Sequence, residues 1–117
     1  MKKIVLLSDT HGLLREEVRA LLAEADAVVH AGDFDTPEVA DALRACAEPH
    51  LVRGNNDGAW AEDLPRTLAF TIEGVRFFLA HNRRDVPRGL NGVDVVVCGH
   101  SHKYASEDRG GVLWLNP

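Results

Sequence analysis

Residues able to bind metal ions follow several apolar runs of this sequence. The clearest case is VVVCGHSHKY, in which an apolar run ends at Cys98 and is followed by His100 and His102. A lone histidine is more often a hydrogen-bonded structural residue, and two at this spacing could arise by chance. The arrangement recurs, however, because the run KIVLLS leads directly into Asp9 and His11. We therefore consider the residues after each apolar run as one set.

The set has the composition of a transition-metal site. It contains carboxylates, imidazoles and one carboxamide: Asp9, His11, Asp33, Asn55, His81, His100 and His102. One ion with about four to six ligands does not need all of them, whereas two ions sharing a bridging carboxylate do. Mixed oxygen and nitrogen ligands without thiolate suit Mn²⁺, Ni²⁺, Zn²⁺, Fe or Co²⁺. The sequence thus predicts two divalent ions, with Mn²⁺ preferred.

The elements expected around these residues alternate between strands and helices. Short apolar runs predict strands over residues 3–8, 27–31 and 50–54. A helix is expected over 13–24, and a second over 36–47, where a threonine cap precedes a proline in the first turn. The inward face of the first helix would carry Leu14, Val18, Leu21, Leu22 and Ala25, and that of the second Val39, Ala40 and Leu43. This order implies parallel strands.

The second half of the sequence predicts strands of another kind. TLAFTI and VRFFLA flank Glu73-Gly74, which indicates a hairpin. Two more strands are expected in VDVVVC and GVLWLN. The hairpin implies a mixed sheet, or a second sheet packed on the first. Each run that precedes a candidate ligand would deliver it at the carboxyl end of a strand, where open α/β sheets bind ligands.

Composition limits the function classes. A chain of 117 residues is expected to form one domain. The net charge of -5 argues against general nucleic-acid binding, although a bound metal would still allow phosphate substrates. Two cysteines give no disulfide framework. We find no signal peptide and no run of membrane-spanning length, so we expect no membrane partner and a cytoplasmic location.

Five short motifs, in order, resemble the calcineurin-like metallophosphoesterase superfamily. They are Asp9-x-His11, Gly32-Asp33, Gly54-Asn55-x-Asp57, His81 and Gly99-His100-x-His102. The SDTHG opening and the length resemble its branch of small single-domain prokaryotic phosphodiesterases, the YfcE type. The resemblance implies an α/β (α+β) fold with two mixed β-sheets packed as a sandwich and flanked by helices. It also implies that Asp9, His11 and His102 hold one metal, that Asn55, His81 and His100 hold the other, and that Asp33 bridges them.

The resemblance further implies a phosphoesterase in which a metal-bound hydroxide attacks phosphorus. Two divalent ions, two aspartates and one hydroxide together leave a charge of about +1, which suits a phosphodiester monoanion. We therefore expect a phosphodiesterase rather than a monoesterase, acting on a small phosphoester. The natural substrate and the oligomeric state cannot be read from the sequence.

Some positions depart from the family pattern or have two interpretations. Asn82 and Arg83 stand where the family commonly has glycine and histidine, and the chain ends where the family continues into further strands. Residues 1–117 are therefore expected to form one domain whose carboxyl end is either naturally short or truncated. Asn56 replaces a histidine that in larger relatives protonates the leaving group. Asp57 either orients a metal ligand or forms a turn, and Arg83 either meets a substrate phosphate or lies in a solvated loop.

Three other functions were weighed against this prediction. A catalytically silent module with the metallophosphoesterase fold, acting as a scaffold, would be expected to lack ligands, and none is missing. A receiver domain needs paired acids after the first strand and a lysine after the fifth, which this sequence lacks. A nucleotide-binding domain would show a glycine-rich phosphate loop, and neither G-x-G-x-x-G nor a P-loop is present.

Overall fold

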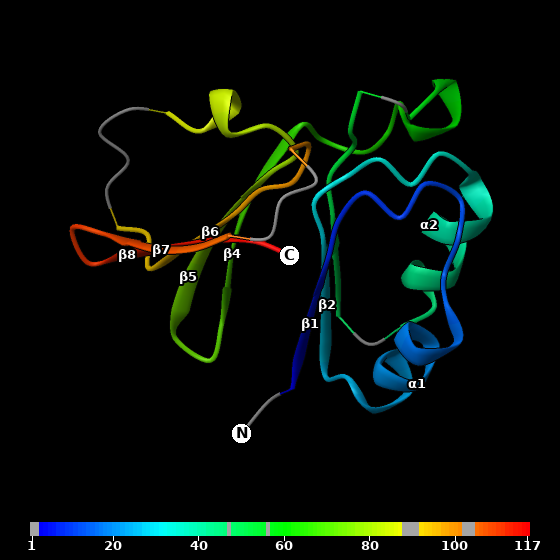
Figure 1. Ribbon diagram of the computed structural model, residues 1–117, viewed down its shortest axis with the longest axis horizontal. Helices are drawn as coiled ribbons and strands as arrows, with labels where there is room; N and C mark the ends of the chain where they lie inside the picture. The colour runs from blue at the N-terminus through cyan, green and yellow to red at the C-terminus, as the bar shows by residue number, and fades with distance from the viewer. Residues whose placement is uncertain (1–2, 47, 56, 88–91, 102–104) are drawn as a thin grey trace.

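The computed structural model contains two β-sheets and two α-helices (Figure 1). It describes residues 3–46, 48–55, 57–87, 92–101 and 105–117. Two residues singled out from the sequence, Asn56 and His102, lie outside the described residues. Among the described residues, no helix is long and apolar enough to cross a membrane.

The first sheet is built from the amino-terminal half of the chain. Its strands are β1 (Ile4–Leu7), β2 (Ala27–His30) and β3 (Pro49–Leu51), which are parallel and lie in the order β1-β2-β3. The connections contain α1 (Glu16–Glu24) and α2 (Pro37–Arg44). The predicted parallel arrangement is thus confirmed, because each crossover helix returns the chain to the same end of the sheet.

The second sheet has five strands and is mixed. Its strands are β4 (Thr67–Ile72), β5 (Val75–Ala80), β6 (Val95–Val97), β7 (Ala105–Arg109) and β8 (Val112–Asn116), in the order β4-β5-β6-β8-β7. The β4–β5 hairpin has the predicted bounds. Strand β7 was not predicted, since ASEDR is polar and its last four residues are exposed. Short 3₁₀ helices, η1 (Ala59–Ala61) and η2 (Arg83–Asp85), precede and follow the hairpin.

The two sheets pack face to face, which confirms the predicted sandwich. Apolar side chains from both sheets form one core between them: Ala27, Val29, Ala31, Val52, Ile72, Phe77, Leu79 and Val97. Alternation along β2 sends Val28 and His30 to the other face of the first sheet, toward the helices. Only the five-stranded sheet is mixed, and both described helices cover the outer face of the three-stranded sheet (Figure 1).

The helices are shorter than the sequence indicated. Helix α1 begins at Glu16 rather than residue 13, and Leu21, expected on its inward face, is 57% exposed. Helix α2 buries Val39 and Leu43 as predicted, but the side chain of Thr36 makes no capping hydrogen bond.

Candidate metal centre

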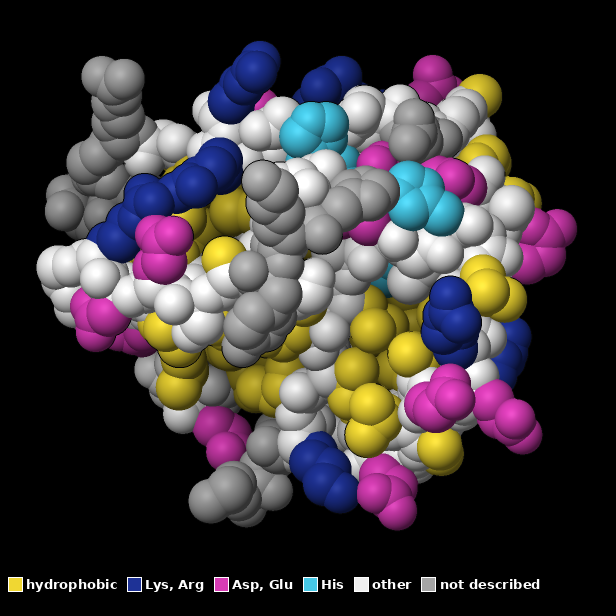
Figure 2. Space-filling model, viewed as in Figure 1, with side chains coloured by type: hydrophobic (Ala, Val, Ile, Leu, Met, Phe, Trp, Pro, Cys, Tyr) yellow, Lys and Arg dark blue, Asp and Glu magenta, His cyan; other side chains and the backbone are white. Residues whose placement is uncertain are grey.

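The candidate ligands gather where the strands of both sheets end. Asp9 and His11 follow β1, Asp33 follows β2, His81 follows β5, and His100 follows β6. Asp33 and His81 are buried, whereas His11 and His100 are exposed. Figure 2 shows histidine and acidic side chains close together on the upper part of this face. The site therefore lies at the boundary between the sheets.

Among the described residues, two groups of side chains are close enough to hold a metal ion, and they share one member. Ligand atoms of Asp9, His11 and Asp33 all lie within 4.8 Å of one another, and so do those of Asp33, His81 and His100. A carboxylate has two oxygens and can therefore serve two ions. Oxygen and imidazole donors in these groups fit a divalent transition metal.

His81 is held in the orientation that a metal ligand needs. Its Nδ1 lies 2.8 Å from the carbonyl oxygen of Ala31, and because a carbonyl can only accept, Nδ1 carries the proton. The Nε2 atom therefore has a lone pair available for a metal. It lies 3.3 Å from Oδ2 of Asp33 and 3.3 Å from Nδ1 of His100. A backbone partner on the far nitrogen is the usual way to fix a ligating histidine.

His11 is oriented by a carboxylate that the sequence analysis missed. Its Nδ1 lies 2.9 Å from Oδ2 of Asp35, and its Nε2 lies 4.0 Å from Oδ1 of Asp9. The hydrogen bond to Asp35 is the largest effect and raises the pKa of His11. Desolvation opposes it, and the negative charges of Asp35, Asp33 and Asp9 add to the rise. An acid two residues after Asp33, in the stretch GDFD, was the available signal.

Asp57 holds two of the ligand loops together. Its Oδ2 accepts hydrogen bonds from the backbone N–H groups of Asp33 (3.0 Å) and Gly54 (2.8 Å), and its Oδ1 accepts one from Asp35 (2.9 Å). Asp57 also closes a turn, because its own N–H donates to the carbonyl oxygen of Gly54 at 3.3 Å. Both interpretations given above therefore remain, and the carboxylate acts on the backbone around Asp33. The carboxylate thereby fixes the loop after β2 against the loop after β3.

Two glycines allow the loops to approach this closely. A Cβ atom on Gly54 would overlap Asp33, and one on Gly99 would overlap Ser8 and lie 2.7 Å from Oδ2 of Asp9. The same Asp9 oxygen accepts a hydrogen bond from the backbone N–H of His100 at 3.0 Å. Glycine at these two positions therefore lets the backbone approach the site.

Backbone strain is concentrated at the candidate centre. Seven described non-glycine residues have a positive φ, and five of them belong to the loops just discussed: Asp9, His11, Asp33, Asp35 and His100. Such conformations are uncommon for residues with a Cβ atom and occur preferentially at functional sites. The surrounding hydrogen bonds must therefore hold these residues in place.

His30 is a buried residue that contacts the loops after β1 and β2. It is fully buried, stacks on Phe34 with ring centroids 4.0 Å apart, and accepts a hydrogen bond at Nδ1 from the backbone N–H of Gly32. Its Nε2 therefore carries the proton and donates to Oγ1 of Thr10 at 3.0 Å. Desolvation lowers the pKa of His30 to about 3. His30 thus links the loop after β1 to the loop after β2, a contact that the sequence did not indicate.

The remaining predicted residues line two adjoining cavities. Asn55, His81 and His100 line one of about 570 Å³. The other, of about 660 Å³, contains Trp114 and Arg83, whose guanidinium lies 5.6 Å from the centroid of the Trp114 ring. Both cavities are bordered by Asn82, Arg84 and His100.

Asn116 is a further residue that the sequence analysis missed. Its Nδ2 donates to the carbonyl oxygen of Gly99 at 3.3 Å and to Oγ of Ser101 at 2.8 Å. These two bonds hold the loop that presents His100. A single asparagine at the end of an apolar strand gave no signal of this contact, which joins segments 15 to 17 residues apart in the sequence.

The family to which this fold and site belong is shown by comparison with known proteins. The family model described as the calcineurin-like phosphoesterase superfamily domain matches residues 1–117. The chain therefore belongs to the calcineurin-like phosphoesterase superfamily. This confirms the resemblance inferred from the five motifs.

Individual relatives agree with this assignment. A protein named probable metallophosphoesterase from Methanothermobacter thermautotrophicus is 30% identical over 97% of this chain and 74% of its own length. The phosphodiesterase YfcE of Escherichia coli is 32% identical over 100% of this chain and 78% of its own. Its solved structure superposes with a TM-score of 0.78, covering 99% of this chain and 78% of that one, with 29% identity.

A second solved structure is similar in fold. Vps29 from Entamoeba histolytica, solved in complex with Zn²⁺, has a TM-score of 0.78 and 24% sequence identity, covering 97% of this chain and 72% of that chain. At this level of identity the likeness concerns the fold.

Proposed function

We propose that this protein is a phosphodiesterase that uses two divalent metal ions. The observation that carries the proposal is that Asp33 belongs to both three-residue groups, so that one buried carboxylate faces two sets of donors. Asp9 and His11 would hold one ion with Asp33, and His81, His100 and Asn55 the other. His102, which lies outside the described residues, is proposed as a ligand of the first ion on the basis of its motif.

The residues of the chain would act mainly by positioning. When bound, the two ions would activate a water molecule as the nucleophile and offset the negative charge of the phosphate. Asp35 and the carbonyl of Ala31 orient the imidazoles of His11 and His81, so that each presents Nε2. Asp57 keeps Asp33 in place through the backbone. Preorganised ligands of this kind avoid reorganisation during the reaction.

A preference for diesters follows from charge. With both ions, two aspartates and a hydroxide, the centre would carry about +1, which one diester monoanion neutralises. Manganese is the metal that we propose from the set suited to mixed oxygen and imidazole donors, which also contains Zn²⁺, Fe, Co²⁺ and Ni²⁺. Zn²⁺ is the alternative metal to test, because the similar Vps29 structure was solved in complex with it.

Hydrolysis of two aryl esters tests the proposal. Bis(p-nitrophenyl) phosphate and p-nitrophenyl phosphate share a leaving group and differ in the number of ester bonds. We expect Mn²⁺ to support hydrolysis, a chelator to abolish it, and kcat/KM to be higher for the diester. Asp33→Asn should remove activity and both ions in elemental analysis, whereas Asp41→Asn, an exposed change on α2, should affect neither.

The rival function is a binding module with this fold and no catalysis. It would be supported if the chain bound metal but hydrolysed neither ester with Mn²⁺, Zn²⁺, Co²⁺ or Ni²⁺. Faster hydrolysis of the monoester would instead retain the phosphoesterase and overturn the preference for diesters.

A further inference from the structure

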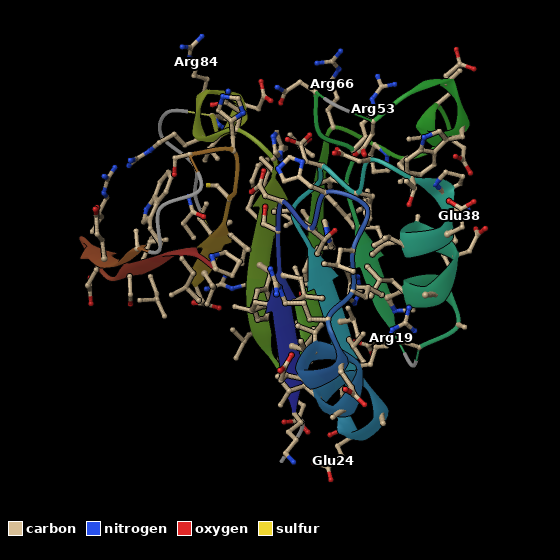
Figure 3. All side chains as sticks on the ribbon, turned by 45° about the vertical axis from the view of Figure 1, so that its right-hand side comes forward. Arg19, Glu24, Glu38, Arg53, Arg66 and Arg84 are labelled. Atoms are coloured by element: carbon tan, nitrogen blue, oxygen red, sulfur yellow. The ribbon has the colours of Figure 1, made fainter. Side chains whose placement is uncertain are left out.

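Three arginines surround the cavity that contains the candidate metal ligands. Arg53 follows β3, Arg66 precedes β4, and Arg84 lies in η2, so three separate segments supply them. All three line the 570 Å³ cavity together with Asn55, His81 and His100. Figure 3 labels these arginines and shows them projecting from the edge of the molecule at which the strands end. We call Arg53, Arg66 and Arg84 the arginine rim.

The arginine rim has no carboxylate partner within the part of the chain that the structure describes. Other arginines do have one, since Arg76 pairs with Asp94 at 3.2 Å and Arg109 with Glu107 at 2.8 Å. No ion pair is found there for Arg53, Arg66 or Arg84. In a chain of net charge -5, three such cations around one cavity call for an explanation.

Two carboxylates also line this cavity, and they do not neutralise the rim. Asp57 directs its oxygens to three backbone N–H groups. Asp85 lies in η2 and is exposed. The described residues that line the cavity thus include three guanidinium groups and two carboxylates. Guanidinium groups bind phosphate oxygens through paired hydrogen bonds, which makes the rim a suitable site for an anion.

We propose that the substrate is a phosphodiester that carries a second phosphate group away from the bond that is cleaved. This inference rests on the proposed function, which places the scissile phosphate at the metal ligands. A simple diester monoanion satisfied by the metals would leave the rim without a ligand. A second phosphate on the same molecule would extend from His100 and Asn55 to Arg66 and Arg84, which border the same cavity.

The test compares two substrates with the same scissile bond. Thymidine 5′-(p-nitrophenyl phosphate) has one phosphate, and its 3′-phosphorylated form has a second. We expect a KM roughly tenfold lower for the 3′-phosphorylated form in low salt, the effect of one charge-assisted contact. The advantage should shrink as salt is raised to 0.5 M, because exposed charges are screened over about 4 Å at that strength.

Variants locate the effect. Arg66→Gln and Arg84→Gln should each lower the ratio of the two KM values toward 1. Arg44→Gln is the matched control, because Arg44 is an exposed arginine on α2 that lies near Asp41 and Asp63 and does not line the cavity. Equal KM values for the two substrates in the wild type, or an equal loss in the Arg44 variant, would overturn the inference.

A binding measurement separates this inference from the proposed function. Calorimetry on the metal-free protein compares thymidine 3′,5′-bisphosphate with thymidine 5′-phosphate. Tighter binding of the bisphosphate that is lost in Arg66→Gln supports the arginine rim even if neither ester is hydrolysed, in which case the proposed function alone fails. Equal binding of the two compounds overturns the rim as a phosphate site even if both esters are hydrolysed.

Discussion

At the scale of single residues, the groups that support the candidate ligands, two carboxylates and the carbonyl of Ala31, are as well defined as the ligands. Asp35 holds His11, Ala31 holds His81, and Asp57 holds the backbone of three residues. Each of these contacts fixes a direction or a proton position. Changes at the supporting residues should therefore alter metal affinity without removing a ligand.

Asp57→Asn tests this most directly. The amide can retain one acceptor oxygen, but its NH₂ group must then face a backbone N–H that had been bonded to the carboxylate. We expect the unfolding free energy to fall by about 1–3 kcal/mol. We also expect metal affinity to fall by roughly 10–100-fold. Urea unfolding and calorimetric titration with Mn²⁺ measure the two effects.

The control for Asp57→Asn is Asp108→Asn. Asp108 also accepts a backbone hydrogen bond, from Gly111 in the exposed turn between β7 and β8. Its replacement should leave Mn²⁺ affinity unchanged. Unaltered affinity in the Asp57 variant would mean that its three hydrogen bonds serve stability alone.

Because the pKa of the buried His30 is lowered, we expect the unfolding free energy to depend on pH. Desolvation lowers its pKa in the folded state to about 3, with a smaller lowering effect from the charge of His81 and an opposing one from Asp9. In the unfolded chain the pKa is near 6.5, so the unfolded state binds a proton first as the pH falls. This contribution to stability is complete above about pH 6.5 and is lost toward pH 3, at up to ~1.4 kcal/mol per pH unit.

Two measurements check the role of His30. The ring resonances of His30 in the nuclear magnetic resonance spectrum of the metal-free protein should not titrate between pH 7 and 5. In urea unfolding, His30→Asn should be less stable at pH 7, although its amide oxygen can still accept from Gly32. It should lose less stability on acidification because the amide does not titrate. A titration midpoint of His30 above pH 5 would contradict the prediction.

At the scale of elements, the turn of the β4–β5 hairpin sets the register of its strands and so the position of His81. The β4–β5 hairpin turns through Glu73 and Gly74, both of which have positive φ values, 48° and 79°. This is the twist that two-residue hairpins favour. The register pairs Thr67 with Ala80, so that His81 leaves the sheet beside the loop after β2. A hairpin turn thus positions a candidate ligand at the far end of its strands.

Two glycine-to-alanine changes separate backbone strain from crowding. A Cβ on Gly74 would meet nothing within 4 Å, yet its positive φ makes alanine unfavourable, so Gly74→Ala should lower the unfolding free energy by about 1–2 kcal/mol. Gly58 has a φ of -87°, and a Cβ there would make an ordinary contact with Trp60 at 3.7 Å. Gly58→Ala should therefore be neutral or raise stability by up to ~1 kcal/mol.

Urea unfolding of both glycine variants provides the measurement. Each substitution adds one methyl group at an exposed turn position, so each is the control for the other. Equal stability changes would show that the backbone conformation at Gly74 contributes nothing to the hairpin.

At the scale of the whole molecule, the candidate centre joins the two sheets. Asp33 comes from the three-stranded sheet, whereas His81 and His100 come from the five-stranded one. The apolar core between the sheets is the other main connection. An ion held by Asp33, His81 and His100 would therefore cross-link the two halves of the sandwich.

Metal binding is accordingly expected to stabilise the fold. At a free Mn²⁺ concentration of 100 times Kd, the folded state gains about 2.7 kcal/mol. For a chain of this size, that corresponds to a rise in Tm on the order of 10 °C. Differential scanning calorimetry with and without Mn²⁺ measures the shift. Asp33→Asn should abolish it, and a full shift in that variant would place the stabilising ion elsewhere.

The sequence by itself determined the family, the main elements and the candidate ligands. Apolar runs identified most strands because buried strands require them, and the loops after those strands held the chemically informative residues. The polar strand β7 carried no such pattern. The exposed Leu21 shows that helical periodicity alone does not decide which side chains are covered. A local pattern shows which side chains share a face of an element, but whether that face is buried depends on the neighbouring elements.

Only the tertiary structure decided how the ligand loops are held. Asp57 reaches Asp33 across 24 residues, and Asn116 reaches Gly99 across 17. The gathering of Arg53, Arg66 and Arg84 likewise depends on the packing of three separate segments around one cavity. The physical reason is that hydrogen bonds and charges act through space. A residue that supports a distant loop therefore needs no particular neighbours in the sequence.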